Sequence, residues 1–231
     1  RMDPRLEAHL NHLIDRYPKL IVCRDNIASA YEILETAYGN GRKLLVCGNG
    51  GSASDSEHIV GELMKEFKLK RRVYQIENEK LKIENSERYA GVGEKMVEID
   101  NELGQMLREN LQGALPAISL TGHSALQTAY MNDAVPELVF AQQVNGYGKA
   151  GDVFLGISTS GNSRNVLYAA VAARAKGLKV IGLTGARENK LMQFADVCIR
   201  VPETETYKVQ ELHLPVYHCL CLMLEERFFG N

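Results

Sequence analysis

The sequence has no apolar run of the roughly 18 residues that a membrane-spanning helix needs, so we expect no membrane partner. It also lacks an excess of one charge, since 27 Lys and Arg residues stand against 29 Asp and Glu residues, for a net charge of −2. This balance argues against an electrostatic binder of nucleic acid, and we expect no such partner. Residues 68–72 form a basic cluster, which a solvated surface explains better than a polyanion site.

The N-terminal residues lack the positively charged and then apolar layout of a signal peptide. The cysteines are odd in number and show no zinc-ribbon spacing. Because they fall mostly in apolar stretches, we expect buried free thiols and a cytoplasmic protein. The five cysteines are Cys23, Cys47, Cys198, Cys219 and Cys221.

With 45% hydrophobic residues, the 231 residues are enough for one large domain over 1–231. Residues 3–38 show helical spacing of apolar residues, and Pro18 divides them into two helices. From residue 43 on, apolar runs of strand length alternate with helical segments. This alternation predicts the α/β class: a mostly parallel central sheet with helices on both faces, a flavodoxin-like three-layer sandwich.

The segment from about 72 to 112 differs in composition, since it is rich in Glu, Lys and Asn and carries apolar residues at helical spacing. About 40 residues make a poor core of their own, so we expect a helical insertion rather than a separate domain. A surface or subunit-contact elaboration is favoured for it, and a substrate lid stays open as the alternative.

Two glycine-rich turns follow apolar strands and precede helices. Residues 156–163, GISTSGNS, combine hydroxyls with the N–H groups of a helix N-terminus, which suits a phosphate monoester. Residues 48–52, GNGGS, have the same placement, and parallel sheets bind ligands at the carboxyl ends of their strands. Neither turn has a P-loop lysine or Rossmann spacing, which disfavours nucleotides. A plain serine-rich turn is the alternative.

His58 and Glu62 are four residues apart on one predicted helix and face the same side. Gln210 and His218 are eight apart on the last helix and lie close to one face. Taken alone, His58 and Glu62 form a surface pair more often than a metal site. If the two helices converge, the four side chains make a plausible Zn²⁺ site.

The motifs CGNGGSASDSEHIVGEL, LGISTSGNSRNV, KVIGLTG and VQELHLPVYH resemble, in order and spacing, the sedoheptulose-7-phosphate isomerases of the SIS (sugar-phosphate isomerase) superfamily. The resemblance covers residues 1 to about 70 and 113–231, so the fold it implies is a single SIS domain. ISTSGNS marks the superfamily, while SEHxxxE and QExHxxxxH are more specific to this branch.

The resemblance implies conversion of sedoheptulose 7-phosphate to D-glycero-D-manno-heptose 7-phosphate through an enediol or enediolate, in a homotetramer. It implies a Zn²⁺ site formed by His58, Glu62, Gln210 and His218, with Glu62 and His218 also as the acid–base pair. The implied substrate or phosphate contacts are Asn49, Gly50, Ser52, Asn132, Asp133, Ser158, Thr159, Ser160, Ser163 and Gln210.

Two positions depart from the family pattern. Tyr207 stands where the family has an acidic residue, and Glu66 stands near a basic position. Both leave open an isomerase or sensor for another sugar phosphate. A non-enzymatic relative that binds proteins in replication initiation is the second alternative, and the complete ligand set favours an enzyme over it.

Overall fold

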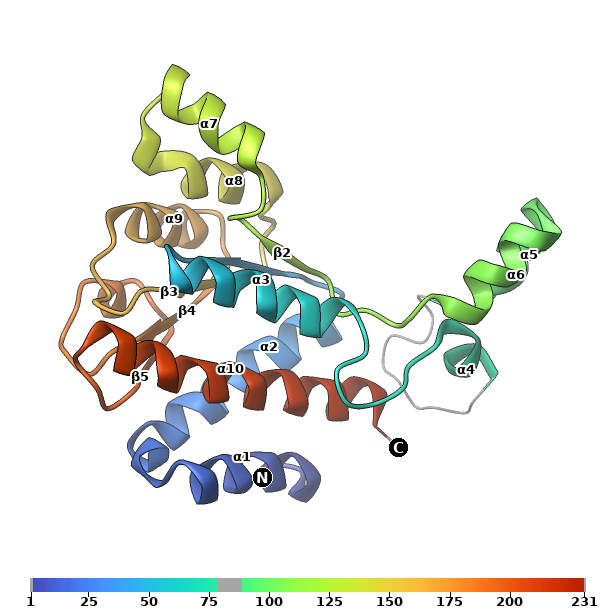
Figure 1. Cartoon of the computed structure of the whole chain (residues 1–231), viewed down its shortest axis with the longest axis horizontal. Coiled ribbons are helices and arrows are strands. Elements are labelled where there is room, and N and C mark those ends of the chain that lie inside the picture. The colour runs from blue at the N-terminus through green and yellow to red at the C-terminus, as the bar shows by residue number, and fades with distance from the viewer. Residues whose placement is uncertain (1, 79–88, 231) are drawn as a thin grey trace.

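The computed structural model of the chain describes residues 2–78 and 89–230. A sheet of five parallel strands lies at its centre, in the order β2-β1-β3-β4-β5 (Figure 1). The parallel order confirms the predicted α/β class. The strands are β1 (Leu44–Cys47), β2 (Ala117–Ser119), β3 (Val153–Ile157), β4 (Lys179–Thr184) and β5 (Val197–Arg200).

Successive residues of a central strand point into two different cores. Phe154 packs with one cluster of buried residues and Leu155 with the other, as the two-residue period of a strand requires. Every residue of β1 and β3 is buried, which explains why these strands are continuous apolar runs rather than alternating ones.

One face of the sheet is covered by the N-terminal helices, the helix after β1 and the last helix, as Figure 1 shows. Pro18 ends the first helix as predicted, and a short 3₁₀ turn joins it to the second. These elements are α1 (Pro4–Arg16), η1 (Pro18–Cys23), α2 (Arg24–Gly39), α3 (Gly51–Met64) and α10 (Thr206–Phe229).

The other face is covered chiefly by α8 (Val139–Tyr147) and α9 (Arg164–Ala175), which complete the three layers. The helix α7 (Ser124–Asp133) lies outside this layer and has no buried residue. Two 3₁₀ turns, η3 (Pro136–Leu138) and η4 (Leu191–Gln193), complete the elements of this half.

Arg72 and Gln112 form an isolated antiparallel bridge, and the described residues between them are mostly helical, as expected. It contains α4 (Val73–Asn78), α5 (Val92–Ile99) and α6 (Asn101–Asn110), while residues 79–88 of the predicted insertion lie outside the described residues. Figure 1 shows α5 and α6 projecting away from the sheet as a hairpin. The hairpin closes tightly at Gly104, where a Cβ would collide with the backbone of Met96.

The five cysteines are free thiols; Cys198 is half-buried and the other four are buried, as predicted. Among the described residues, no helix is both long enough and apolar enough to cross a membrane. One boundary differs from what the sequence predicts. The segment that follows the first glycine-rich turn reads as a helix that ends near Phe67, whereas α3 ends at Met64.

Candidate active site

The two glycine-rich loops lie side by side at the carboxyl edge of the sheet. They follow β1 and β3, which are adjacent strands with Cys47 paired to Gly156. The side chains of Asn49 and Asn165 exchange two hydrogen bonds, of 2.9 and 2.8 Å. Because Asn49 belongs to the first loop and Asn165 to the first turn of α9, this amide pair joins the two loops into one surface.

The second loop has the features of an anion site. Ser158 Oγ and Ser163 Oγ are 2.9 Å apart, and Ser163 occupies the N-cap of α9 without capping it through its side chain. The first N–H groups of a helix have no partner within the helix, so they are available to a ligand. Gly161 has a φ of +67°, which lets the chain turn between the serines. The backbone and hydroxyls here suit a phosphate.

The first loop contributes a buried hydroxyl and a close helix contact. Ser52 is buried in the first turn of α3, next to Gly50, whose φ is +56°. A Cβ on Gly51 would lie 2.8 Å from Gln210 Nε2, so the start of α10 rests directly on the start of α3. Glycine at position 51 therefore makes room for Gln210.

The packing of α10 on α3 brings three of the four predicted ligand residues near one another, while Gln210 contacts Gly51 at the start of α3. His58 Nε2 lies 3.2 Å from Glu62 Oε1, within one helix. The rings of His58 and His218 meet edge to face, with centroids 5.0 Å apart. His58 and Tyr217, the neighbour of His218, are 159 residues apart in sequence, so the packing of the two helices places two imidazoles and a carboxylate in one neighbourhood.

Tyr217 and Asp55 fix the orientation of His58. The Tyr217 hydroxyl lies 3.1 Å from Asp55 Oδ1 and 2.9 Å from His58 Nδ1. A hydroxyl has one proton, so when it donates to the Asp55 carboxylate it must accept from His58 Nδ1–H. His58 Nε2 then turns toward Glu62, an arrangement typical of a histidine that binds a metal.

Two acceptors 3.2 Å apart, an imidazole lone pair and a carboxylate oxygen, need a proton or a cation between them. Glu62 Oε2 and His218 Nε2 are also buried without a hydrogen-bond partner, although Lys65 Nζ lies 3.6 Å from the former. Two ligands of a tetrahedral zinc ion stand about 3.3 Å apart. These observations fit a cation, although the described residues contain no preformed group of three His, Cys, Asp or Glu around a single point.

Burial acts on the ionisable groups of this neighbourhood. It lowers the pKa of His218, and the nearby His58 ring lowers it further. The same cause raises the pKa of Asp55, against the hydrogen bond from Tyr217. A neutral His218 can accept a proton and return it, which suits an acid–base group near neutral pH.

Comparison with known proteins gives the chain a family. A model of the SIS domain matches residues 95–185. The phosphoheptose isomerase of Rhodospirillum rubrum is 34% identical over 97% of this chain and 98% of its own length, and that of Geotalea daltonii is 38% identical over 89% and 85%. The chain belongs to the phosphoheptose isomerase family. The structure of the Neisseria gonorrhoeae phosphoheptose isomerase superposes with a TM-score of 0.68 at 29% identity, covering 96% of this chain and 98% of that one.

Asn132 and Asp133, which the resemblance places near the sugar, form a hydrogen bond with each other. Both are exposed at the C-terminal end of α7, where the Asn132 amide donates to Asp133 Oδ1 at 2.8 Å. No hydrogen bond within the described residues connects them to either loop. Their contact with a sugar stays a prediction.

The two positions that depart from the family pattern have different surroundings. Tyr207 is 58% exposed on the first turn of α10, one turn before Gln210. Glu66 accepts from the backbone N–H of Arg71 at 3.2 Å and pairs with Arg72 at 3.1 Å. Tyr207 is therefore accessible to a ligand, whereas Glu66 is engaged at the base of the insertion.

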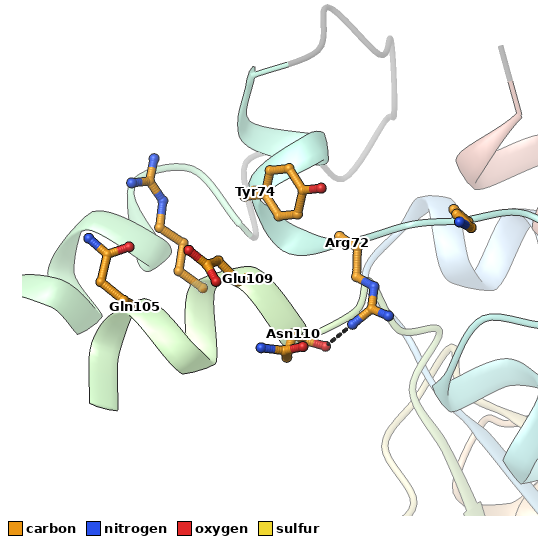
Figure 2. Close-up of a pocket in the computed structure, with 7 residues that line it drawn as sticks. Arg72, Tyr74, Gln105, Glu109 and Asn110 are labelled. Carbon is orange, nitrogen blue, oxygen red and sulfur yellow. Dashed lines mark hydrogen bonds between the residues drawn. The ribbon is translucent and has the colours of Figure 1, made fainter. Parts of the chain in front are cut away.

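A hollow of about 700 Å³ lies in the insertion, away from the motifs of the family (Figure 2). Arg72 donates there to the Asn110 carbonyl at 2.9 Å. A smaller cavity of about 170 Å³ between α1 and α10 reaches His218 and is bordered by Arg16 and His12. Only the second cavity touches the residues expected to do chemistry.

Sequence reasoning missed the residues that support the site. Asn165 follows the serine-rich turn, and Asn49 lies in the other glycine-rich turn. Two amides in neighbouring turns were a signal that they could form hydrogen bonds with each other. Tyr217 directly precedes His218, and Asp55 is three residues before His58. That spacing signals a possible partner on α3, but the pairing itself requires the packing of α10 on α3.

Proposed function

We propose that this protein isomerises sedoheptulose 7-phosphate to D-glycero-D-manno-heptose 7-phosphate. The observation that supports this most is a pair of buried atoms without a hydrogen bond, Glu62 Oε2 and His218 Nε2, on two helices packed beside a phosphate-type loop. Isomerisation between a ketose and an aldose requires just such a pair, a base for carbon and a proton carrier for oxygen.

Glu62 is the base and His218 the partner in this proposal. Glu62 takes a proton from C1 of the ketose, which leaves an enediolate across C1 and C2. The protonated carboxyl exchanges its proton with solvent and then delivers a proton to C2. His218 carries a proton from the C1 hydroxyl to the C2 oxygen. No atom is gained or lost, so the reaction needs no oxidant and no organic cofactor.

In this proposal, the residues that would hold Zn²⁺ are His58, Glu62, Gln210 and His218. The Glu62 carboxylate has two oxygens, of which Oε1 faces His58 and Oε2 has no hydrogen bond, so one carboxylate can serve both ligand and base. When bound, the ion supplies positive charge beside the oxygens of C1 and C2. The hydrogen bond between the Tyr217 hydroxyl and His58 Nδ1 would leave His58 Nε2 free to bind the ion.

The phosphate binds at the serine loop, with the sugar extending along α3. From Ser52 to Glu62 the helix rises about 15 Å, so the ends of a seven-carbon sugar phosphate reach different turns of one helix. Asn132 and Asp133 are proposed to contact the sugar. The proposed phosphate and pocket contacts are Asn49, Gly50, Ser52, Ser158, Thr159, Ser160, Ser163 and Gln210.

A homotetramer is part of the proposal. Gln210 and His218 lie on one side of α10, and the exposed apolar residues Leu214 on α10 and Met64 on α3 offer surface for another subunit. The alternative substrate is a different sugar phosphate. One observation favours it: the exposed Tyr207 ring stands one turn before Gln210, where the family resemblance implies an acidic side chain.

Turnover of sedoheptulose 7-phosphate by purified, Zn²⁺-loaded protein tests the proposal, with detection of the aldoheptose phosphate. Glu62→Gln should abolish turnover, whereas Glu32→Gln, the same change at an exposed position on α2, should not. A folded, metal-loaded protein that leaves the heptose unchanged but converts another ketose or aldose phosphate would shift the assignment to that sugar. Inactivity toward all of them would end it.

A further inference from the structure

A charged pair is buried where the insertion joins the site. Arg71 and Glu225 are each about 2% exposed, and Arg71 Nε lies 3.6 Å from Glu225 Oε1. Taking two charges out of water costs several kcal/mol per ion, and an apolar pair in the same space is often as stable. Net stability alone therefore does not explain this pair, and its contacts point to a second role.

Glu225 binds the loop that follows α3. Its Oε1 accepts the backbone N–H of Phe67 at 2.9 Å. Its Oε2 accepts those of Lys68 at 2.8 Å and Leu69 at 3.0 Å. Three successive amides converge on one carboxylate of α10, so the loop is fixed to the helix that carries His218.

Arg71 caps the C-terminal end of α3. It donates to the carbonyl oxygens of Glu62 at 3.0 Å, Leu63 at 3.2 Å and Lys65, while its guanidinium stacks on Phe229 at 4.5 Å. The last carbonyls of a helix lack partners within the helix, and a cation there is favourable. This cap also explains why α3 ends at Met64 instead of continuing to Phe67.

The same pair reaches both members of the acid–base pair. Arg71 binds the main-chain carbonyl of Glu62 itself. Phe67, held by Glu225, packs its ring against His218 with centroids 5.5 Å apart. On the basis of the proposed function, we infer that Arg71 and Glu225 are positioning residues that hold the end of α3 against α10 and so set Glu62 opposite His218.

Asp152 offers a matched control. It is also a buried carboxylate, it accepts the backbone N–H groups of Lys43 at 3.1 Å and Lys149 at 2.8 Å, and it pairs with Lys43 Nζ. It precedes β3, at the edge of the sheet opposite the loops. Asp152→Asn thus removes a comparable buried charge without touching α3 or α10.

The experiment compares Glu225→Gln, Arg71→Lys and Asp152→Asn in full-length, Zn²⁺-loaded protein, at a temperature where circular dichroism shows each variant folded. The readouts are kcat, KM and the Cε1–Hε1 resonance of His218. We expect the first two variants to lower kcat on the order of 100-fold with little change in KM, because misplacement by about 1 Å has that effect. We expect their His218 resonance to move and that of Asp152→Asn to stay in place.

A His218 resonance that moves no more than in Asp152→Asn overturns the inference, and so does an unchanged kcat. If the wild-type protein does not convert the heptose phosphate, the proposed function fails. The His218 resonance then still tests whether Arg71 and Glu225 position His218. Hydrogen exchange on the wild-type protein gives a test without variants: the amides of Phe67, Lys68 and Leu69 should be as protected as those of β3. Rapid exchange of these loop amides would also overturn it.

Discussion

His213 lies fully buried on α10, and its burial should make the free energy of unfolding decrease at acidic pH. Burial lowers the pKa of this imidazole from 6.5 to about 4, against a smaller opposite influence from the backbone of Thr184. In the folded protein His213 stays neutral down to about pH 4. In the unfolded chain it takes up a proton below about pH 6.5.

The unfolded chain therefore binds more protons between pH 6.5 and 4, and the free energy of unfolding falls as the pH falls through this window. A factor of ten in proton affinity is worth about 1.4 kcal/mol. Moving the pKa of His213 to about 4 therefore costs about 3 kcal/mol of stability at the acid end. Above pH 6.5 this residue contributes no pH dependence.

Urea unfolding of wild type and His213→Gln at pH 7.5, 6.5, 5.5 and 4.5 measures the effect. His9 and His218, whose pKa values burial also lowers, are present in both proteins, so their contribution cancels in the difference. The free energy of unfolding of wild type minus that of His213→Gln should fall by about 3 kcal/mol as the pH falls across the window. The fall should be steepest near pH 5. Two parallel curves of free energy against pH would refute the reasoning.

Three further predictions concern the site. Tyr217→Phe removes the hydroxyl that orients His58 and should weaken Zn²⁺ binding about 10–100-fold in a chelator competition; unchanged affinity would contradict the orienting role. Gly51→Ala places a Cβ against Gln210 and should lower kcat while the melting temperature stays near wild type, whereas an unaltered kcat would show that Gln210 is not needed. Ser163→Ala should raise KM on the order of 10–100-fold, since a hydrogen bond to a charged group is worth about 1.5–3 kcal/mol, and a KM equal to wild type would place the phosphate elsewhere.

The layers and loops were predictable because their signals are local. A strand buried on both faces is an apolar run, as in β1 and β3, and a glycine-rich turn after such a run lies at the carboxyl edge of a parallel sheet. The spacing of His58 and Glu62 placed them on one side of a helix. These features need only the periodicity of a single element.

The contacts that complete the site are long-range, and one sequence does not determine them. Asn49 and Asn165 meet across 116 residues, and His58 meets Tyr217 across 159. The end of α3 was misplaced for the same reason, because its cap, Arg71, is itself held by a residue on α10. Spacing within a helix predicts which side chains share a face, but not which helix packs against that face.

The family match covers nearly the whole chain. On the proposed function, the exposed Tyr207, one turn before Gln210, is the residue expected to alter which sugar is accepted. The serine loop and the His58–Glu62 pair carry the proposed phosphate binding and proton transfer. We therefore expect the proton chemistry to be retained more strictly than the choice of sugar.

Proton exchange during turnover in D₂O tests the central claim most directly. Zn²⁺-loaded protein is incubated with sedoheptulose 7-phosphate, and ¹H NMR follows the aldoheptose phosphate and the protons on C1 and C2. The account predicts product formation with deuterium entering at C2, and loss of both in Glu62→Gln but not in Glu32→Gln. Product formation that persists undiminished in Glu62→Gln would contradict it.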